Sequence, residues 1–140
     1  ALLWREKMNI QQQSDRRFRL LPDGEVRWSE AARHWVQNCD WAVYVAECGD
    51  EITGYIIGRT QDSPPGLLPT KIGVVTEMTI GAHSGQSGLG RYLLMPLRQW
   101  FADQQITHLI ALVPQRQPVE QAFWRALGAT ELTDILWMKI

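Results

Sequence analysis

The segment "HSGQSGLGRYLL", from His83 to Leu94, decides how the rest of the chain is interpreted. Three glycines lie within six residues, and a helix-like apolar pattern follows at once. A glycine inside a helix costs about 1 kcal/mol relative to alanine, so the cluster needs a reason. A strand that runs into a glycine-rich turn and then a helix is typical of phosphate binding, because bare backbone N–H groups can approach an anion closely.

Two phosphate-binding motifs do not match this segment. A P-loop requires Lys-Ser or Lys-Thr after its glycines, and neither pair follows here. A dinucleotide fingerprint reads GxGxxG, whereas Gly85, Gly88 and Gly90 read GxxGxG and follow an expected hairpin. A plain tight turn is the remaining alternative, although a turn needs one or two glycines rather than three at this spacing.

The composition of the chain is that of an ordinary globular protein. With 140 residues, 45% hydrophobic and 21% charged, we expect one domain over residues 1–140. The net charge of −1 excludes a global field for nucleic acid or anionic membranes. No apolar run approaches the roughly 20 residues of a membrane span, and no signal-peptide pattern is present. We therefore expect a cytoplasmic protein without nucleic-acid or membrane partners.

Cysteine and histidine usage predicts neither disulfides nor a metal site. Cys39 and Cys48 form no CxxC pair, so we expect reduced thiols. The three histidines are scattered and have no cysteine or carboxylate at metal-ligand spacing.

Apolar periodicity and turn residues predict the order of helices and strands. The expected elements are a helix before the polar run "QQQSDRR", a helix at 28–38, strands at 41–47, 51–58 and 71–80, a helix after the glycines, a strand at 107–114, a helix at 119–128 and a strand at 135–140. Ser29 is the expected N-cap of the second helix, and a kink is expected at Pro96. Gly128 fits the position that ends the last helix. The side chains of that helix expected to face the core are Val119, Phe123, Ala126 and Leu127.

Three segments together resemble the GNAT superfamily of N-acetyltransferases. Met78-Thr79-Ile80 followed by Gly88-Leu89-Gly90 resembles its acyl-CoA-binding motif, R/Q-x-x-G-x-G/A after a strand. "ECGDEITGYIIG" resembles its second and third strands, and "AFWRALGA" (122–129) resembles its late helix motif, usually F-Y-x-x-L-G-F. The order of elements also matches, so the resemblance covers nearly the whole chain.

The resemblance implies an α/β (α+β) fold with a mixed, mostly antiparallel sheet flanked by helices. The expected order is α-α-β-β-β-α-β-α-β, in which the first strand of the family is missing. Ala1 in place of Met suggests a trimmed chain or a piece of a longer protein.

The resemblance also implies acetyl-CoA as co-substrate. Its pyrophosphate would lie on the backbone N–H groups from Gln86 to Arg91, and its pantetheine arm would pair with the strand backbone at Met78 and Ile80. A bulge would separate this strand from residues 107–114, so that the thioester reaches into the gap. The implied cofactor-binding residues are Met78, Thr79, Ile80, Gly85, Gln86, Ser87, Gly88, Leu89, Gly90, Arg91, Gln117 and Trp124.

Three positions depart from the pattern of the family. The usual Arg or Gln before the glycines falls on Gly85, and Gln117 stands where Asn is frequent. The tyrosine that acts as general acid is replaced by Trp124, whose indole N–H donates a hydrogen bond but does not release a proton near neutral pH.

Direct attack on a thioester needs a neutral amine, and an alkylamine has a pKa of about 10.4, so a base must remove a proton. Glu77 is the candidate catalytic base, and a solvent-facing or salt-bridged strand residue is the alternative. The oxyanion would meet a backbone N–H near Ile80. Arg16, Arg17 and Arg19 fall where the resemblance places the substrate-facing loop and either select an acidic substrate or form a solvated face.

The function that follows is an acetyl-CoA-dependent N-acetyltransferase working by direct transfer. The acceptor is a small-molecule or peptide amine that the sequence does not identify. The alternative is a non-catalytic domain that binds acyl-CoA as a sensor or interaction module. Members of the family often pair through the edge of the sheet, which leaves a homodimer open.

Overall fold

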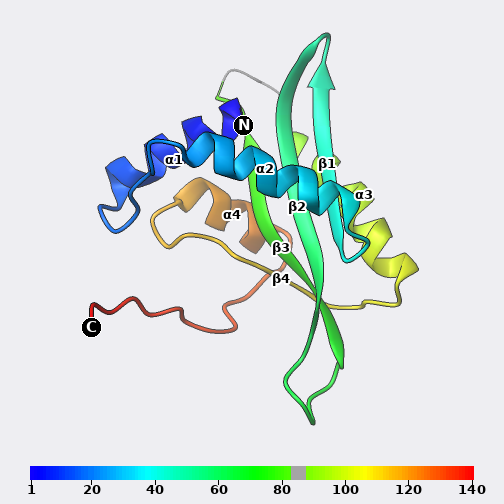
Figure 1. The fold of residues 1–140 in the computed structure, drawn as a ribbon. Helices are drawn as coiled ribbons and strands as arrows, with labels where there is room; N and C mark the ends of the chain where they lie inside the picture. Colours follow the sequence, from blue (N-terminus) through cyan, green and yellow to red (C-terminus); the bar gives the residue numbers. More distant parts are fainter. Residues whose placement is uncertain (83–87) are drawn as a thin grey trace.

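The structure, a computed structural model, describes residues 1–82 and 88–140. The elements in these ranges are α1 (Leu2–Ser14), α2 (Gly24–Gln37), β1 (Trp41–Cys48), β2 (Glu51–Asp62), β3 (Lys71–Ile80), α3 (Leu89–Asp103), β4 (Leu109–Ala111) and α4 (Pro118–Ala126). The strands form one sheet in the order β1-β2-β3-β4. Figure 1 shows α1 and α2 across one face of this sheet and α3 on the other.

The sheet is mixed and mostly antiparallel, as the resemblance implied. β1 and β2 form a hairpin through the expected turn at Gly49 and Asp50, and β3 runs antiparallel to β2. β4 is parallel to β3, which requires the crossover that α3 provides.

The main core lies between the sheet and α3. Leu93, Leu97 and Phe101 of α3 are almost fully buried, as is Ile56 of β2. The glycine at position 58 permits this close approach, because a Cβ there would lie 2.7 Å from the side chain of Leu97. Trp124 of α4 joins the same cluster.

The opposite face of the sheet is covered by aromatic side chains from α1 and α2. Trp28 stacks on Trp4 and packs against Tyr55 of β2, with ring centroids 5.9 and 5.4 Å apart. Trp35 stacks on Trp41 of β1 at 5.1 Å. Several of the tryptophans therefore fix the two N-terminal helices on the sheet.

Two expectations about the helices are wrong in detail. α2 begins at Gly24 rather than after Ser29, whose hydroxyl instead donates to the carbonyl of Glu25 inside the helix. In α4, Val119 is 83% exposed while Trp124 is 5% exposed. The buried face of α4 is thus formed by Trp124, with Phe123 and Leu127 packed beside it. Ala126 is exposed as well, contrary to expectation. Gly128 ends the helix with a φ of +89°, as expected.

The predicted last strand, residues 135–140, does not form. Its side chains extend into solvent, with Leu136 89% and Trp137 71% exposed. The physical reason is the shortness of β4, whose three residues offer little edge for a further strand to pair with. The observed order is therefore α-α-β-β-β-α-β-α, and residues 107–114 form a strand only over Leu109–Ala111.

Both cysteines are unpaired and exposed. The helices in the described ranges are each too short or too polar to cross a bilayer.

Pro96 lies inside α3, and the kink expected there stays a prediction.

Candidate functional site

The strands β3 and β4 pair over only part of their length. Gly73–Val75 lie beside Leu109–Ala111, and the N–H of Leu112 donates to the carbonyl of Val75. One residue further, Thr76 is an extra residue in β3, because Ile57 of β2 lies opposite Glu77 and the next residue of β2 lies opposite Val75. A bulge of this kind bends its strand. The predicted bulge that separates the strand from residues 107–114 is confirmed.

Beyond the bulge, the outer edge of β3 is open in the described part of the chain. The N–H of Gly81 donates to the carbonyl of Thr53 in β2. The backbone N–H and C=O groups of successive residues in a strand point in opposite directions. Since Gly81 points toward β2, the backbone groups of Met78 and Ile80 point away from β2. The ammonium of Lys7 donates to the carbonyl of Met78 at 2.7 Å, which confirms this direction. In the described part of the chain, the edge that was predicted to pair with a pantetheine arm therefore has no strand paired with it beyond Val75.

Two neutral donors hold the side chain of Glu77. Trp28 Nε1 donates to one carboxylate oxygen at 3.2 Å, and the hydroxyl of Tyr55 donates to the other at 2.9 Å. Burial and the negative charge of Glu77 both raise the pKa of Tyr55, so its phenol remains a neutral donor. Glu77 is half-buried and forms no ion pair with any described residue. Among the described residues, the salt bridge of the alternative interpretation is thus not seen, and the role of Glu77 as base stays a prediction.

A buried ion pair lies at the same edge of β3. The side chains of Lys7 (α1) and Glu120 (α4) are 16% and 14% exposed, and Lys7 Nζ lies 3.4 Å from Glu120 Oε2. Burial raises the pKa of Glu120, Lys7 opposes this shift, and the negative charge of Glu77 adds to it. The two carboxylates are thus close enough to sense each other while having different partners.

Sequence reasoning missed four of these residues. Lys7 carried a usable signal, since it interrupts an apolar stripe on α1 that includes Trp4 and Met8. Glu120 precedes Trp124 by one helical turn, so the two side chains share a face of α4. Trp28 was predicted only as an apolar helix residue, and nothing in the sequence singled out Tyr55.

The N-terminus of α3 lies next to the end of β3. Gly88 occupies the N-cap with a φ of +101°, and the first turn contains no acidic residue. A Cβ on Gly90 would lie 2.8 Å from the ring of Phe123 and 3.4 Å from Ile80, so the glycine permits a close approach. Helix N-termini offer unpaired N–H groups and a positive potential to anions. The predicted cradle residues Gly85, Gln86 and Ser87 lie outside the described residues.

The remaining predicted site residues differ in their solvent exposure. Met78, Thr79 and Leu89 are buried, each 6–7% exposed as a whole residue. Ile80 is 41% exposed. Arg91 is exposed in the first turn of α3, and Gln117 is the half-buried N-cap of α4.

Trp124 carries an unsatisfied polar atom. Its Nε1 is buried and has no hydrogen-bond partner among the residues that the structure describes. Leaving a buried donor unpaired costs about 1–3 kcal/mol, which a ligand with an acceptor atom would recover. Trp124, which the resemblance places where the family usually has a tyrosine, thus has an N–H group without an acceptor in the described part of the chain. No group of His, Cys, Asp or Glu in the described ranges could hold a metal ion.

Comparison with known structures shows the same fold in several proteins. The tetramutant of the BH1408 protein from Bacillus halodurans has a TM-score of 0.79 at 18% identity, covering 100% of this chain and 91% of its own. The aminoglycoside 6'-N-acetyltransferase AAC(6')-Ig from Acinetobacter haemolyticus has a TM-score of 0.72 at 13% identity, covering 94% and 91%. AAC(6')-Iy, solved with the bisubstrate analogue CoA-S-monomethyl-acetylneamine, has a TM-score of 0.73 at 12% identity, covering 95% and 88%.

Sequence comparison assigns the family. No curated protein matches the chain significantly. The sequence model of the Acetyltransferase (GNAT) family, however, matches residues 6–129, which include the open edge of β3, Lys7, Glu77 and Glu120. The chain therefore belongs to the acetyltransferase (GNAT) family, and its class of activity is that of an N-acetyltransferase.

Proposed function

We propose that this chain transfers the acetyl group of acetyl-CoA to an amine by direct attack of the amine in a ternary complex. The observation that carries the proposal is Glu77, a carboxylate held by two neutral donors beside the open edge of β3. A carboxylate oriented in this way can accept the proton of an attacking amine, directly or through a water molecule.

The residues present fit acetyl-CoA as the co-substrate. The outward backbone groups of Met78 and Ile80 suit an extended amide-containing arm, which binds as an added strand does. The N-terminus of α3 suits a pyrophosphate, and the unpartnered N–H of Trp124 suits a thioester oxygen or sulfur. When bound, acetyl-CoA supplies an activated acyl group. The structure of AAC(6')-Iy with a CoA-based bisubstrate analogue supports this assignment through the shared fold.

The roles of the protein side chains follow from their partners. Glu77 takes the proton of the amine, and a backbone N–H near Ile80 donates to the acyl oxygen. As the new C–N bond forms and the C–S bond breaks, the leaving sulfur takes a proton from Glu120 when that carboxyl is protonated, or from water when Glu120 is the anion paired with Lys7. Burial raises the pKa of Glu120, so it holds a proton closer to neutral pH than an exposed carboxyl does. Glu120 thereby replaces the tyrosine that this chain lacks.

A second candidate function rests on Trp124. An indole in place of the usual acid favours a domain that binds acyl-CoA without turning it over. The two functions differ in whether any amine is acetylated. Both candidate functions require that the protein meets acetyl-CoA. For the transferase function we take this location to be the cytoplasm.

The substitution Gly88→Glu tests the anion site. It places a carboxylate at the N-terminus of α3, where it repels a pyrophosphate, and we expect acetyl-CoA affinity measured by titration calorimetry to fall by about tenfold or more. Gly66→Glu is the matched control, because Gly66 also has a positive φ (+87°) and open space around its Cβ. Equal losses in both variants would mean that strain, not the anion site, is responsible.

The substitution Glu77→Gln tests the base. The amide keeps the shape of the side chain but cannot accept a proton, so kcat should fall on the order of 10²-fold while the Kd for acetyl-CoA stays nearly unchanged. Steady-state kinetics and calorimetry on the same preparation provide both values. An unchanged kcat would remove Glu77 from the mechanism.

The substitution Lys7→Met tests the coupling between Lys7 and Glu120. Lys7 lowers the pKa of Glu120, so its removal should raise that pKa further, as followed by carboxyl carbon NMR. When the pKa of a carboxyl is higher in the folded state than in the unfolded state, its contribution to stability is fully present at a pH below the unfolded-state pKa. That contribution is lost as the pH rises through the folded-state pKa. Lys7→Met should therefore extend this loss of stability to higher pH. Arg5→Met is the control, since Arg5 pairs with Glu25 at the surface. Identical Glu120 titrations in both variants would contradict the coupling.

A further inference from the structure

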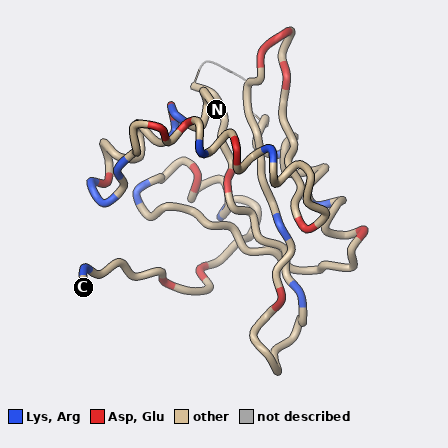
Figure 2. The backbone as a smooth tube through the Cα atoms, viewed as in Figure 1, with Lys and Arg blue, Asp and Glu red and all other residues tan. Residues whose placement is uncertain are grey.

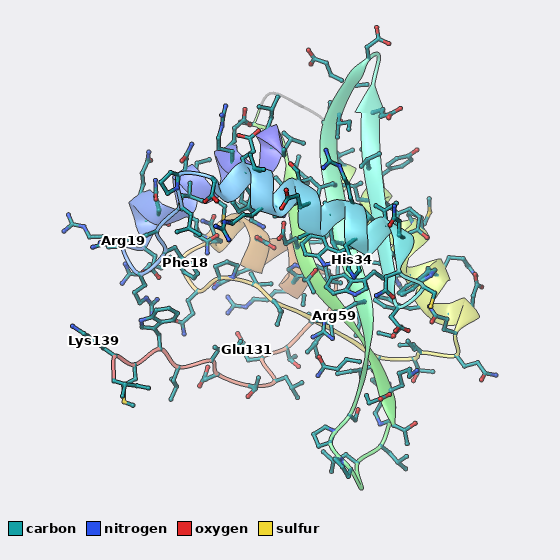
Figure 3. All side chains as sticks on the ribbon, in the orientation of Figure 1. Phe18, Arg19, His34, Arg59, Glu131 and Lys139 are labelled. Carbon is teal, nitrogen blue, oxygen red and sulfur yellow. The ribbon has the colours of Figure 1, made fainter. Side chains whose placement is uncertain are left out.

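A cavity of about 380 Å³ lies between α1, the loop that follows it and the start of α2. This size lies at the small end of sites for small organic ligands. Figure 3 shows Phe18 and Arg19 on the loop at the outer end of α1. The apolar side chains that line the cavity are Trp4, Met8, Phe18, Leu20, Leu21 and Trp28.

The cavity is connected to the candidate base through one side chain. Trp28 forms part of its wall, stacks on Trp4, and donates its indole N–H to Glu77. The side chain of Trp28 therefore contacts both the cavity and the carboxylate of Glu77. This places the cavity beside the proposed reaction centre rather than at an unrelated surface.

The charged side chains around the cavity are arginines. Arg19 and Arg27 line it, and no acidic side chain does. Arg27 is paired with Asp23, and the neighbouring Arg17 is paired with Asp15. Arg19 has no ion-pair partner within the described ranges and is exposed. Figure 2 shows basic residues gathered along this loop. The cavity thus offers an apolar body with a cation at its mouth.

We propose that this cavity binds the acceptor, an amine with an aromatic or apolar body that carries an anionic group, and that Arg19 pairs with that group. The amine lies at the wall formed by Trp28, whose indole contacts Glu77, while the body packs against Trp4 and the anion faces the guanidinium of Arg19. This proposal rests on the proposed acetyl transfer. It excludes aminoglycosides as good acceptors, because a polycation would meet arginine and apolar side chains here instead of carboxylates.

The test compares three acceptors: phenethylamine, phenethylamine with a para-carboxylate, and kanamycin. The carboxylate should raise kcat/KM about tenfold or more over phenethylamine, the effect of one charge-assisted hydrogen bond, and kanamycin should be the poorest of the three. Arg19→Glu should abolish this preference. Arg33→Glu, an exposed arginine of α2 that does not line the cavity, should retain it. Equal kcat/KM values for the two phenethylamines, or the highest value for kanamycin, would overturn the proposal.

Binding is measured separately from turnover. With the para-carboxylate probe, the indole N–H resonances of Trp4 and Trp28 should shift in NMR spectra, while those of Trp100 and Trp137 should not. The shifts should disappear in Arg19→Glu. Specific shifts without acetylation of any amine would support the cavity and contradict the proposed function. Acetylation without these shifts would contradict the cavity and leave the proposed function intact, and the absence of both would contradict each.

Discussion

The bulge at Thr76 is the feature on which the rest of the site depends. By adding one residue to β3, it ends the pairing with β4 after Val75 and leaves the outer backbone groups of Met78 and Ile80 without a strand partner. Buried backbone groups need hydrogen bonds, and a sheet edge offers several in a row. In this structure Lys7 satisfies one of them. An extended ligand could satisfy the edge in the same way a strand would.

Two carboxylates near this edge of β3, Glu77 and Glu120, have different environments. Glu77 receives hydrogen bonds from Trp28 and Tyr55, which orient it without adding positive charge. Glu120 is 14% exposed and is paired with Lys7, and burial raises its pKa. Neighbouring carboxyls whose environments differ are suited to opposite roles in proton transfer. In the proposed mechanism, Glu120, which stands one turn before Trp124 on α4, takes the role that the resemblance assigns to a tyrosine.

Much of the fold could be predicted from local patterns. Alternating β-branched residues around Gly49 and Asp50 predicted the first hairpin, and the run at 71–80 predicted β3 with its observed bounds. The bulge and the open edge came from resemblance to the family. The partners of Glu77 could not be predicted, because Trp28 lies 49 residues away in sequence and meets it only after α2 packs on the sheet. The contact of Lys7 with Met78 spans 71 residues and depends on the same packing.

The expected strand at 135–140 shows the limit of local patterns. Its apolar residues suggested a strand, yet pairing depends on a neighbouring edge that three-residue β4 hardly provides. The prediction of which side chains of α4 face the core was wrong for a related reason. Val119 and Trp124 are both apolar, and only the packing of α4 on the core, where Trp124 joins a cluster with Met78 and Leu89, decides that Trp124 is the buried one.

Amide hydrogen exchange of β3, measured with and without acetyl-CoA, tests the central claim most directly. If the open edge receives the co-substrate as an added strand, exchange at the outward amides of Met78 and Ile80 should slow, while Gly73–Val75, already paired with β4, should change little. Binding of acetyl-CoA that leaves the exchange of Met78 and Ile80 unchanged would contradict the account.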